Sequence, residues 1–214
     1  RREITERERE LEQLVERTVS GAILRPEGTV TVFTYEGNAQ ELAGKQINTL
    51  VSKLCDDLYP KAPRIVNEFV NRNVLSTAAT AARNDVLRRM IDCPGEENLG
   101  ISGYPPQLPI YLSTLKLTGL HRQIGNRWEI SPPEKGTVWF DSWASVEDRT
   151  RSEYCSIAEL WEALSLPPYG IRRGLLPVLT VAFMCANRNR VSILENDSFV
   201  PELSTAIIER LLKS

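Results

Sequence analysis

The sequence predicts an α+β fold that is mostly α, with two winged-helix-like modules preceded by a helical lead-in that contains one short strand. The first observation behind this prediction is a repeated order of patterns. Residues 156–214, and more loosely residues 63–133, show helical periodicity followed by a short hairpin pattern. The second observation is the spacing of prolines and glycines, which keeps each predicted helix short. Helix, turn, helix and hairpin in so short a span is typical of a winged-helix-like module.

Composition and charge restrict the classes of function. Of the 214 residues, 42% are hydrophobic and 25% are charged, which is typical of soluble globular proteins. The net charge of −2 provides no overall positive field, so binding to nucleic acid or to an anionic membrane requires a local basic patch. The longest apolar run, residues 175–186, is too short to span a bilayer, and no signal peptide is evident. We therefore expect a cytoplasmic protein that makes no membrane contact.

The cysteines and the start of the chain add two expectations. The four cysteines are widely spaced and include no C-x-x-C motif. This spacing favours reduced, mostly buried thiols over a disulfide framework. The chain begins with Arg1 rather than an initiator methionine, and a helical pattern starts at once, so we expect a fragment of a longer protein.

Residues 1–62 are predicted to form the lead-in. The apolar face of an amphipathic helix, set among many Glu and Arg residues, consists of Ile4, Leu11, Leu14, Val15 and Val19. A Pro-Glu-Gly break precedes a strand at residues 29–35, which are rich in β-branched and aromatic side chains. A second helix carries apolar residues from Ile47 to Leu58 and ends at the prolines of residues 59–63.

The first winged-helix-like module is predicted at residues 63–133. Its expected elements are a helix containing Ile65, Val66, Phe69 and Val70, a helix over residues 77–91, a helix over residues 107–118 and a hairpin over residues 120–130. Ser76 is a suitable N-cap for the second of these helices. Gly125 and Asn126 are suitable for the tip of the hairpin.

Residues 134–155 are predicted to connect the two modules. Trp139, Phe140 and Trp143 lie at the start of this segment, and we expect the tryptophans to dock on one module. The charged residues 147–151 are expected to form a linker.

The second module is predicted at residues 156–214. Its expected elements are helices at residues 156–164, 172–187 and 201–213, with two short strands at residues 191–194 and 199–200. Ser156 and Glu159 have the spacing of a capping box. Pro167 and Pro168 must end the first helix, because neither can donate a backbone N–H. The second helix is apolar almost throughout, which indicates burial on most sides.

No catalytic, metal-binding or cofactor-binding residue is predicted. Residues 39–46 resemble a phosphate-binding loop only superficially, because Gln46 stands where a hydroxyl should hold magnesium and glycines are few. We expect Gly44 to begin a helix instead. The single histidine, His121, has no neighbours at metal-ligand spacing and is interpreted as a surface residue of a hairpin. Catalysis by a cysteine together with His121 stays open at this point.

Arginines are the candidate nucleic-acid ligands, because winged-helix proteins present basic residues to phosphate groups. In the second module the candidates are Arg172, Arg173, Arg188 and Arg190. In the first module they are Arg83, Arg88, Arg89, Arg122 and Arg127. The alternative is that the second-module arginines cover apolar neighbours or pair with Glu195, Asp197 and Glu202. The modules would then be structural or would contact proteins.

Four segments carry a resemblance to a known family: residues 57–63 (DLYPKAP), 67–72 (NEFVNR), 168–170 (PYG) and 199–203 (FVPEL). Together they resemble the region C-terminal to the P-loop core of large bacterial ATPases in phage-defence systems of the BREX type. The resemblance implies that the nucleotide site lies elsewhere in a much longer chain. It also implies that this region is a non-catalytic accessory part that helps the ATPase to engage double-stranded DNA or partner subunits, the partners being the rest of the ATPase and other defence subunits.

Two other functions stay under consideration. The main alternative is a stand-alone winged-helix DNA-binding regulator, and the third is a diverged nucleotide-binding enzyme. The parent reading frame distinguishes the first two hypotheses. A Walker A and Walker B pair upstream supports the accessory region, whereas a short frame that starts near Arg1 supports the regulator.

Overall fold

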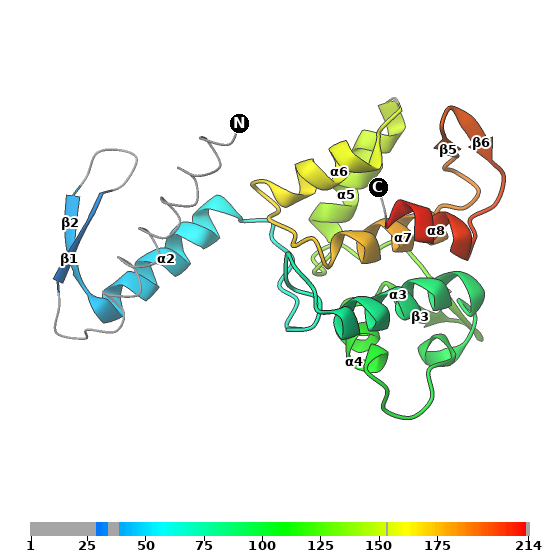
Figure 1. Cartoon of the computed structure of the whole chain (residues 1–214), viewed down its shortest axis with the longest axis horizontal. Helices are drawn as coiled ribbons and strands as arrows, with labels where there is room; N and C mark the ends of the chain where they lie inside the picture. Colours follow the sequence, from blue (N-terminus) through cyan, green and yellow to red (C-terminus); the bar gives the residue numbers. More distant parts are fainter. Residues whose placement is uncertain (1–28, 34–38, 153, 213–214) are drawn as a thin grey trace. The chain divides into compact units, whose positions relative to one another are not determined.

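The computed structural model describes residues 29–33, 39–152 and 154–212 (Figure 1). The chain divides into two compact units, Arg1–Leu58 and Tyr59–Ser214. The module boundaries predicted at residues 62, 133 and 155 are not tested by this division and stay predictions. The predicted N-terminal amphipathic helix lies outside the described residues.

In the first unit, strand β1 (Thr29–Phe33) pairs antiparallel with β2 (Ala39–Ala43), and helix α2 (Gly44–Leu58) follows directly. The predicted strand is confirmed over Thr29–Phe33, and its last two residues, 34 and 35, lie outside the described residues. The start of the helix at Gly44 is also confirmed. Strand β2 is not evident from the sequence, because its residues include no β-branched or aromatic side chain. Hydrogen bonding to β1 outweighs this weak intrinsic preference. Residues 39–43 therefore form a strand and not a phosphate-binding loop.

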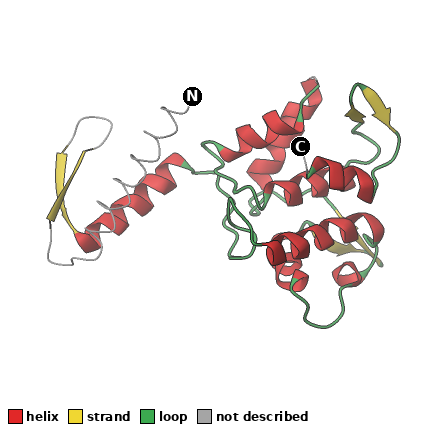
Figure 2. Ribbon diagram, in the orientation of Figure 1, coloured by secondary structure: helices red, strands yellow, loops and turns green. Residues whose placement is uncertain are grey.

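The second unit is dominated by helices, and its strands are confined to two short hairpins (Figure 2). The elements are α3 (Thr77–Asp92), the 3₁₀ turn η1 (Glu97–Gly100), α4 (Gln107–Tyr111), the π turn η2 (Leu112–Lys116), β3 (His121–Ile124), β4 (Arg127–Ile130), α5 (Phe140–Ser152), α6 (Ile157–Ser165), α7 (Leu176–Ala186), β5 (Ile193–Glu195), β6 (Ser198–Val200) and α8 (Thr205–Leu211). The described residues thus form three two-stranded antiparallel sheets among the helices. The predicted α+β, mostly helical class is confirmed.

Local sequence signals explain where several elements begin and turn. The Ser76 hydroxyl accepts the N–H of Ala79 at 3.2 Å, which caps α3 as predicted. Ser156 and Glu159 form the predicted capping box at the start of α6. Gly125 has a φ of +61° at the tip of the β3–β4 hairpin, a conformation that glycine adopts without strain.

The predicted helix at residues 65–70 is wrong, because residues 65–67 have no regular secondary structure and residues 68–70 form a turn. The Asn67 side chain accepts the N–H of Phe69 at 2.9 Å, and the Asn71 side chain donates to the carbonyl of Ile65 at 2.9 Å. Such side-chain bonds offer the backbone an alternative to helical bonding. As a result Ile65 and Val70 are buried, whereas Val66 is 94% exposed.

The connector joins the helical elements through its tryptophans. Trp139 is fully buried and donates its indole N–H to the carbonyl of Thr114 at 2.8 Å. Trp143 packs edge-on against Phe183 of α7, with ring centroids 5.1 Å apart. The tryptophans are docked as predicted, but on both predicted modules rather than on one, since Thr114 belongs to the first and Phe183 to the second. The predicted linker at residues 147–151 is wrong, because these residues continue α5 with an i,i+4 ion pair between Glu147 and Arg151.

Helix α7 lies at the centre of the core of the second unit. Every residue from Leu176 to Phe183 is buried, and the helix packs against α3, α5 and β4. Its burial is confirmed, but it begins four residues later than predicted because Arg172–Leu175 form a turn. The closing helix α8 likewise begins at Thr205 rather than at Pro201. Within the described ranges, no helix is both long enough and apolar enough to cross a membrane.

Candidate nucleic-acid interface

The structure does not bring the four predicted arginines of the second module together. All four side chains are exposed. Arg172 and Arg173 lie on the turn before α7, whereas Arg188 and Arg190 follow its C-terminal end. The helix has 11 residues, so at the usual rise per residue its ends are about 16 Å apart. The four residues therefore form two separate pairs.

The turn that carries Arg172 and Arg173 is held by the chain one hundred residues earlier. The backbone N–H of Arg173 donates to the side chain of Asn73 at 3.2 Å, and that of Gly174 donates to the carbonyl of Arg72 at 2.9 Å. Gly174 permits this close approach, because a Cβ there would meet the carbonyl of Val70 and lie 3.0 Å from that of Arg72. The two backbones are therefore in direct contact.

A second contact extends this pairing toward the start of the unit. The backbone N–H of Lys61 donates to the carbonyl of Pro168 at 3.1 Å. Gly170, with a φ of +59°, lies against the ring of Tyr59, where an added Cβ would be 2.6 Å from Cδ1. Residues 59–61 and 70–73 thus lie beside residues 168–174.

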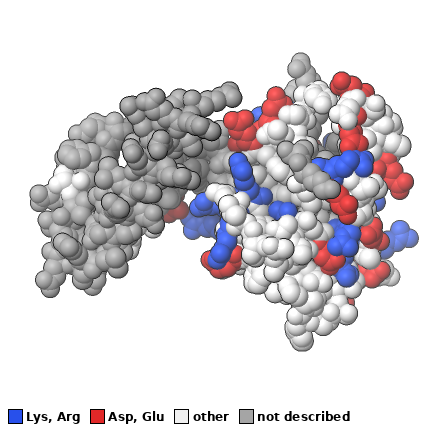
Figure 3. Space-filling view, in the orientation of Figure 1, with Lys and Arg blue, Asp and Glu red and all other residues white. Residues whose placement is uncertain are grey.

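The two segments, residues 59–73 and 168–174, carry five exposed basic side chains. We call this the basic surface, and its members are Lys61, Arg64, Arg72, Arg172 and Arg173. Figure 3 shows several Lys and Arg side chains over this part of the second unit. Glu68 neutralises Arg72 in part, at 2.9 Å. Arg172 and Arg173 form no ion pair with any described residue.

Sequence reasoning missed Lys61, Arg64 and Arg72, because contacts over such a separation have no local pattern. A signal was nevertheless present. Lys61 and Arg72 belong to two of the segments on which the family resemblance rests, residues 57–63 and 67–72.

The pair after α7 is less available for phosphate. Arg190 pairs with Glu147 of α5 at 3.6 Å, and Arg188 donates to the carbonyl of Ile91 at 3.5 Å. The predicted pairing of these arginines with Glu195 is wrong, since Glu195 forms a two-bond ion pair with Arg210 of α8. The partner of Arg190 belongs instead to the segment for which the sequence predicts a linker.

Most candidate arginines of the first module are used within the fold. Arg83 is buried and donates to the side chain of Asn84, and burial lowers its pKa. Arg88 and Arg89 both pair with Asp85. Arg122 donates to two backbone carbonyls, at 2.7 and 3.2 Å. These contacts leave Arg127, which is exposed.

The interpretation of His121 as a surface residue is wrong, because His121 is fully buried. Its Nε2 lies 3.1 Å from the carbonyl of Pro94, so Nε2 carries the hydrogen, and its Nδ1 accepts the hydroxyl of Tyr111 at 2.8 Å. Burial lowers the pKa of His121 and raises the pKa of Tyr111. Both ring nitrogens are occupied, which leaves neither to activate a cysteine. His121 has a structural role.

The cysteines and carboxylates form no reactive cluster in the part of the chain that is described. All four cysteines are free, but Cys55 is exposed and the other three are partly buried, so the expected burial is wrong in degree. No group of three or more His, Cys, Asp or Glu side chains among the described residues is arranged to hold a metal ion.

Comparison with known proteins adds no identification. No protein family, no curated protein and no solved structure matches this chain.

Proposed function

We propose that this chain is a non-catalytic accessory region of a larger bacterial defence ATPase of the BREX type, and that it contacts DNA phosphates through the basic surface. The resemblance of four sequence segments supports the parent ATPase. The exposed side chains of Arg172 and Arg173, which form no ion pair with a described residue, support the contact with DNA. They are held on a turn by backbone bonds to the neighbouring segment, which itself carries three more cations.

The winged-helix-like arrangement is part of this proposal. In the second module, α6, α7 and the β5–β6 hairpin follow one another in the order expected of such a module. In the first module, α3, α4 and the β3–β4 hairpin also follow one another in this order, but the helix predicted before α3, at residues 65–70, is absent. This order of elements supports the winged-helix-like assignment.

The burial of α7 argues for contact with the DNA backbone rather than with base edges. A recognition helix must present its side chains to the major groove. Leu176–Phe183 of α7 are all buried, so this helix offers no such face. Cations on the turn before it can reach phosphates, which position a protein on DNA but carry no sequence information. This argument favours an accessory region over the alternative of a stand-alone sequence-specific regulator.

Contact with partner subunits is a second function of the same region. Val66 and Val74 are 94% and 84% exposed, and Phe69 is 46% exposed, all on the segment that carries Arg72. Exposed apolar side chains grouped beside charged ones are a feature of protein interfaces. We propose that this segment contacts other parts of the ATPase or other defence subunits.

Titration of labelled duplex DNA at low and at moderate salt tests the DNA contact. The variant Arg172→Ala/Arg173→Ala should weaken binding to all sequences alike, and should reduce the slope of log affinity against log salt by about two, one for each phosphate that is no longer neutralised. The matched control is Arg188→Ala/Arg190→Ala, which removes two arginines from the other end of α7 and should leave the slope nearly unchanged. Absence of binding at low salt, or equal effects of the two variants, would contradict the proposal.

A further inference from the structure

A polar pocket of about 580 Å³ lies along one face of α5 in the second unit. Its helical residues recur three and four positions apart, so that Asp141, Ser145, Asp148 and Arg149 share a face. Tyr169, on the turn after α6, and Lys61, near the start of the unit, complete its lining. The volume is within the range of small-molecule sites, about 300 to 1,000 Å³.

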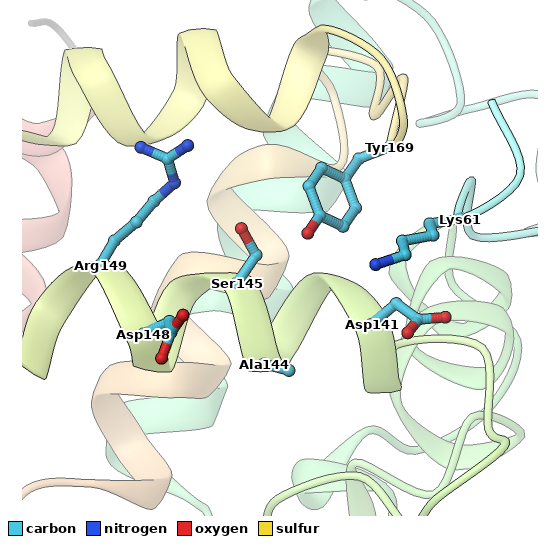
Figure 4. A pocket seen from close by; sticks show the side chains of 7 residues that line it. All are labelled: Lys61, Asp141, Ala144, Ser145, Asp148, Arg149 and Tyr169. Atoms are coloured by element: carbon cyan, nitrogen blue, oxygen red, sulfur yellow. The ribbon is translucent and has the colours of Figure 1, made fainter. Parts of the chain in front are cut away.

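Hydrogen-bond donors from three separate segments converge on this pocket. Figure 4 shows the guanidinium of Arg149 at one end of the pocket and the ammonium of Lys61 at the other, with the hydroxyl of Ser145 and the ring of Tyr169 between them. The Lys61 nitrogen lies 5.9 Å from the centre of the Tyr169 ring, which keeps the cation next to the phenol. Positive charge and hydroxyl groups therefore border the same volume.

The two cations are available to a ligand. Neither Lys61 nor Arg149 forms an ion pair with a described residue, although two carboxylates also line the pocket. In Figure 4 the carboxylate of Asp148 is turned away from the guanidinium of Arg149, whereas Asp141 lies at the same end of the pocket as Lys61 without forming an ion pair with it. Other arginines on or near α5 behave differently, since Arg151 and Arg190 both pair with Glu147.

We propose that this pocket binds a phosphoryl group, carried either by the end of a nucleic-acid strand or by a free nucleotide. The fork of an arginine matches the geometry of phosphate oxygens, and a lysine adds a point charge. The Ser145 and Tyr169 hydroxyls can donate to the remaining oxygens. The inference rests on the geometry of α5 and not on the basic surface, although Lys61 belongs to both.

Calorimetric titration with adenosine monophosphate, inorganic phosphate and adenosine tests the pocket directly. The two phosphate compounds should bind and adenosine should not. Arg149→Gln should weaken binding of adenosine monophosphate about tenfold, the effect expected of one charge-assisted pair. Ser145→Ala should weaken it less. The matched control is Arg151→Gln, which changes an exposed arginine on the same helix outside the pocket and should leave affinity unchanged.

Single-stranded oligonucleotides with and without a 5′-phosphate distinguish the two sources. Tighter binding of the phosphorylated strand, lost in Arg149→Gln, assigns the site to strand ends. Equal binding of both strands, together with Arg149-dependent binding of adenosine monophosphate, assigns it to a free nucleotide. Unchanged affinity for adenosine monophosphate in Arg149→Gln, or binding of adenosine as tight as that of the phosphate compounds, overturns the proposal.

The test of the pocket and the test of the proposed DNA contact can fail independently. Duplex binding that depends on Arg172 and Arg173 should persist in Arg149→Gln. Thermal unfolding followed by circular dichroism should give the same midpoint for wild type, Arg149→Gln and Arg151→Gln, since both arginines are exposed.

Discussion

The two ends of α7 carry similar arginine pairs that the fold treats differently. At the N-terminal end, the backbone of Arg173 and Gly174 is bonded to Asn73 and Arg72, and the arginine side chains form no ion pair with a described residue. At the C-terminal end, the side chains of Arg188 and Arg190 are themselves bonded, to the carbonyl of Ile91 and to Glu147. The comparison teaches that an arginine is available for a ligand when the fold positions its backbone and does not engage its side chain.

Replacing Gly174 by alanine should have the largest effect on stability, at the N-terminal end of α7. A Cβ at this position would meet the carbonyl of Val70 and lie 3.0 Å from that of Arg72, so the two segments of the basic surface must separate. We expect a loss of about 3 kcal/mol in the free energy of unfolding, measured with denaturant. Gly95→Ala is the matched control, because an added Cβ there would have no atom within 4 Å. Equal stability of the two variants would show that the segments do not need this close approach.

The hydrogen bond between Tyr111 and His121 is buried, so it should contribute more to stability than the exposed bonds at the ends of α7. Tyr111→Phe removes the hydroxyl that Nδ1 of His121 accepts at 2.8 Å, and leaves that nitrogen buried without a partner. We expect a loss of about 2 kcal/mol in the free energy of unfolding. The surface variant Tyr104→Phe, at a fully exposed position, should cost almost nothing. If Tyr111→Phe lowers the free energy of unfolding no more than Tyr104→Phe does, the buried hydrogen bond makes no net contribution to stability.

Because of His121, we expect the free energy of unfolding to depend on pH, whereas the arginines at the ends of α7 should add no such dependence. Burial lowers the pKa of His121 from its ordinary value of 6.5, so the unfolded chain binds a proton more readily than the folded one. The stability from neutral His121 is complete above that value and is lost as the pH falls through the window between the unfolded and folded pKa values. Denaturant unfolding between about pH 7.5 and about pH 5.5 should show this decrease. The variant His121→Gln should lack it, because His121 is the single histidine.

Removing the side chain of Asn73 should have a smaller effect, specific to the N-terminal end of α7. Its Oδ1 accepts the N–H of Arg173 at 3.2 Å in an exposed position. Asn73→Ala should lower the free energy of unfolding by about 1 kcal/mol and should weaken duplex binding by loosening the turn. Asn189→Ala, an exposed asparagine after α7, should change neither quantity. If both variants bind duplex equally, the turn does not need this bond to position its arginines.

The smallest expected effect concerns the C-terminal end. Glu147→Gln removes the partner of Arg190 and Arg151, at a cost of less than about 1 kcal/mol because the pairs are largely exposed. We expect the salt dependence of duplex binding to stay unchanged, since this end of the helix lies outside the basic surface. A slope that becomes steeper by about one would instead include Arg190 in the interface.

Local sequence patterns are sufficient to predict those features that depend only on residues a few positions apart. The caps at Ser76 and Ser156 and the tip at Gly125 are predictable, because each depends on bonds or backbone angles of adjacent residues. Predictions fail where a distant partner decides the outcome. Strand β2 exists because β1 lies beside it, and the charged end of α5 is helical because Trp139 and Trp143 anchor that helix in the core.

The residues of the candidate site also divide into those that the sequence predicts and those that only the structure identifies. Arg172 and Arg173 are identifiable from the sequence, because an arginine pair at the start of a buried helix is a local pattern. The position of Lys61, Arg64 and Arg72 beside these arginines, and the polar pocket along α5, cannot be identified in this way. Residues one hundred positions apart have no shared periodicity, and their proximity depends on how closely two backbones can approach.

The sequence by itself determined the helical class, the capped helix starts, the buried character of α7 and the identity of the arginine candidates, because these depend on residue type and short spacing. Only the tertiary structure decided which cations share a surface, which are neutralised and that His121 is buried. The physical reason is that charge pairing and burial depend on distance in space, and here that distance is set by the contact of Gly174 with residues 70–72 and by the packing of α7 against α3 and α5.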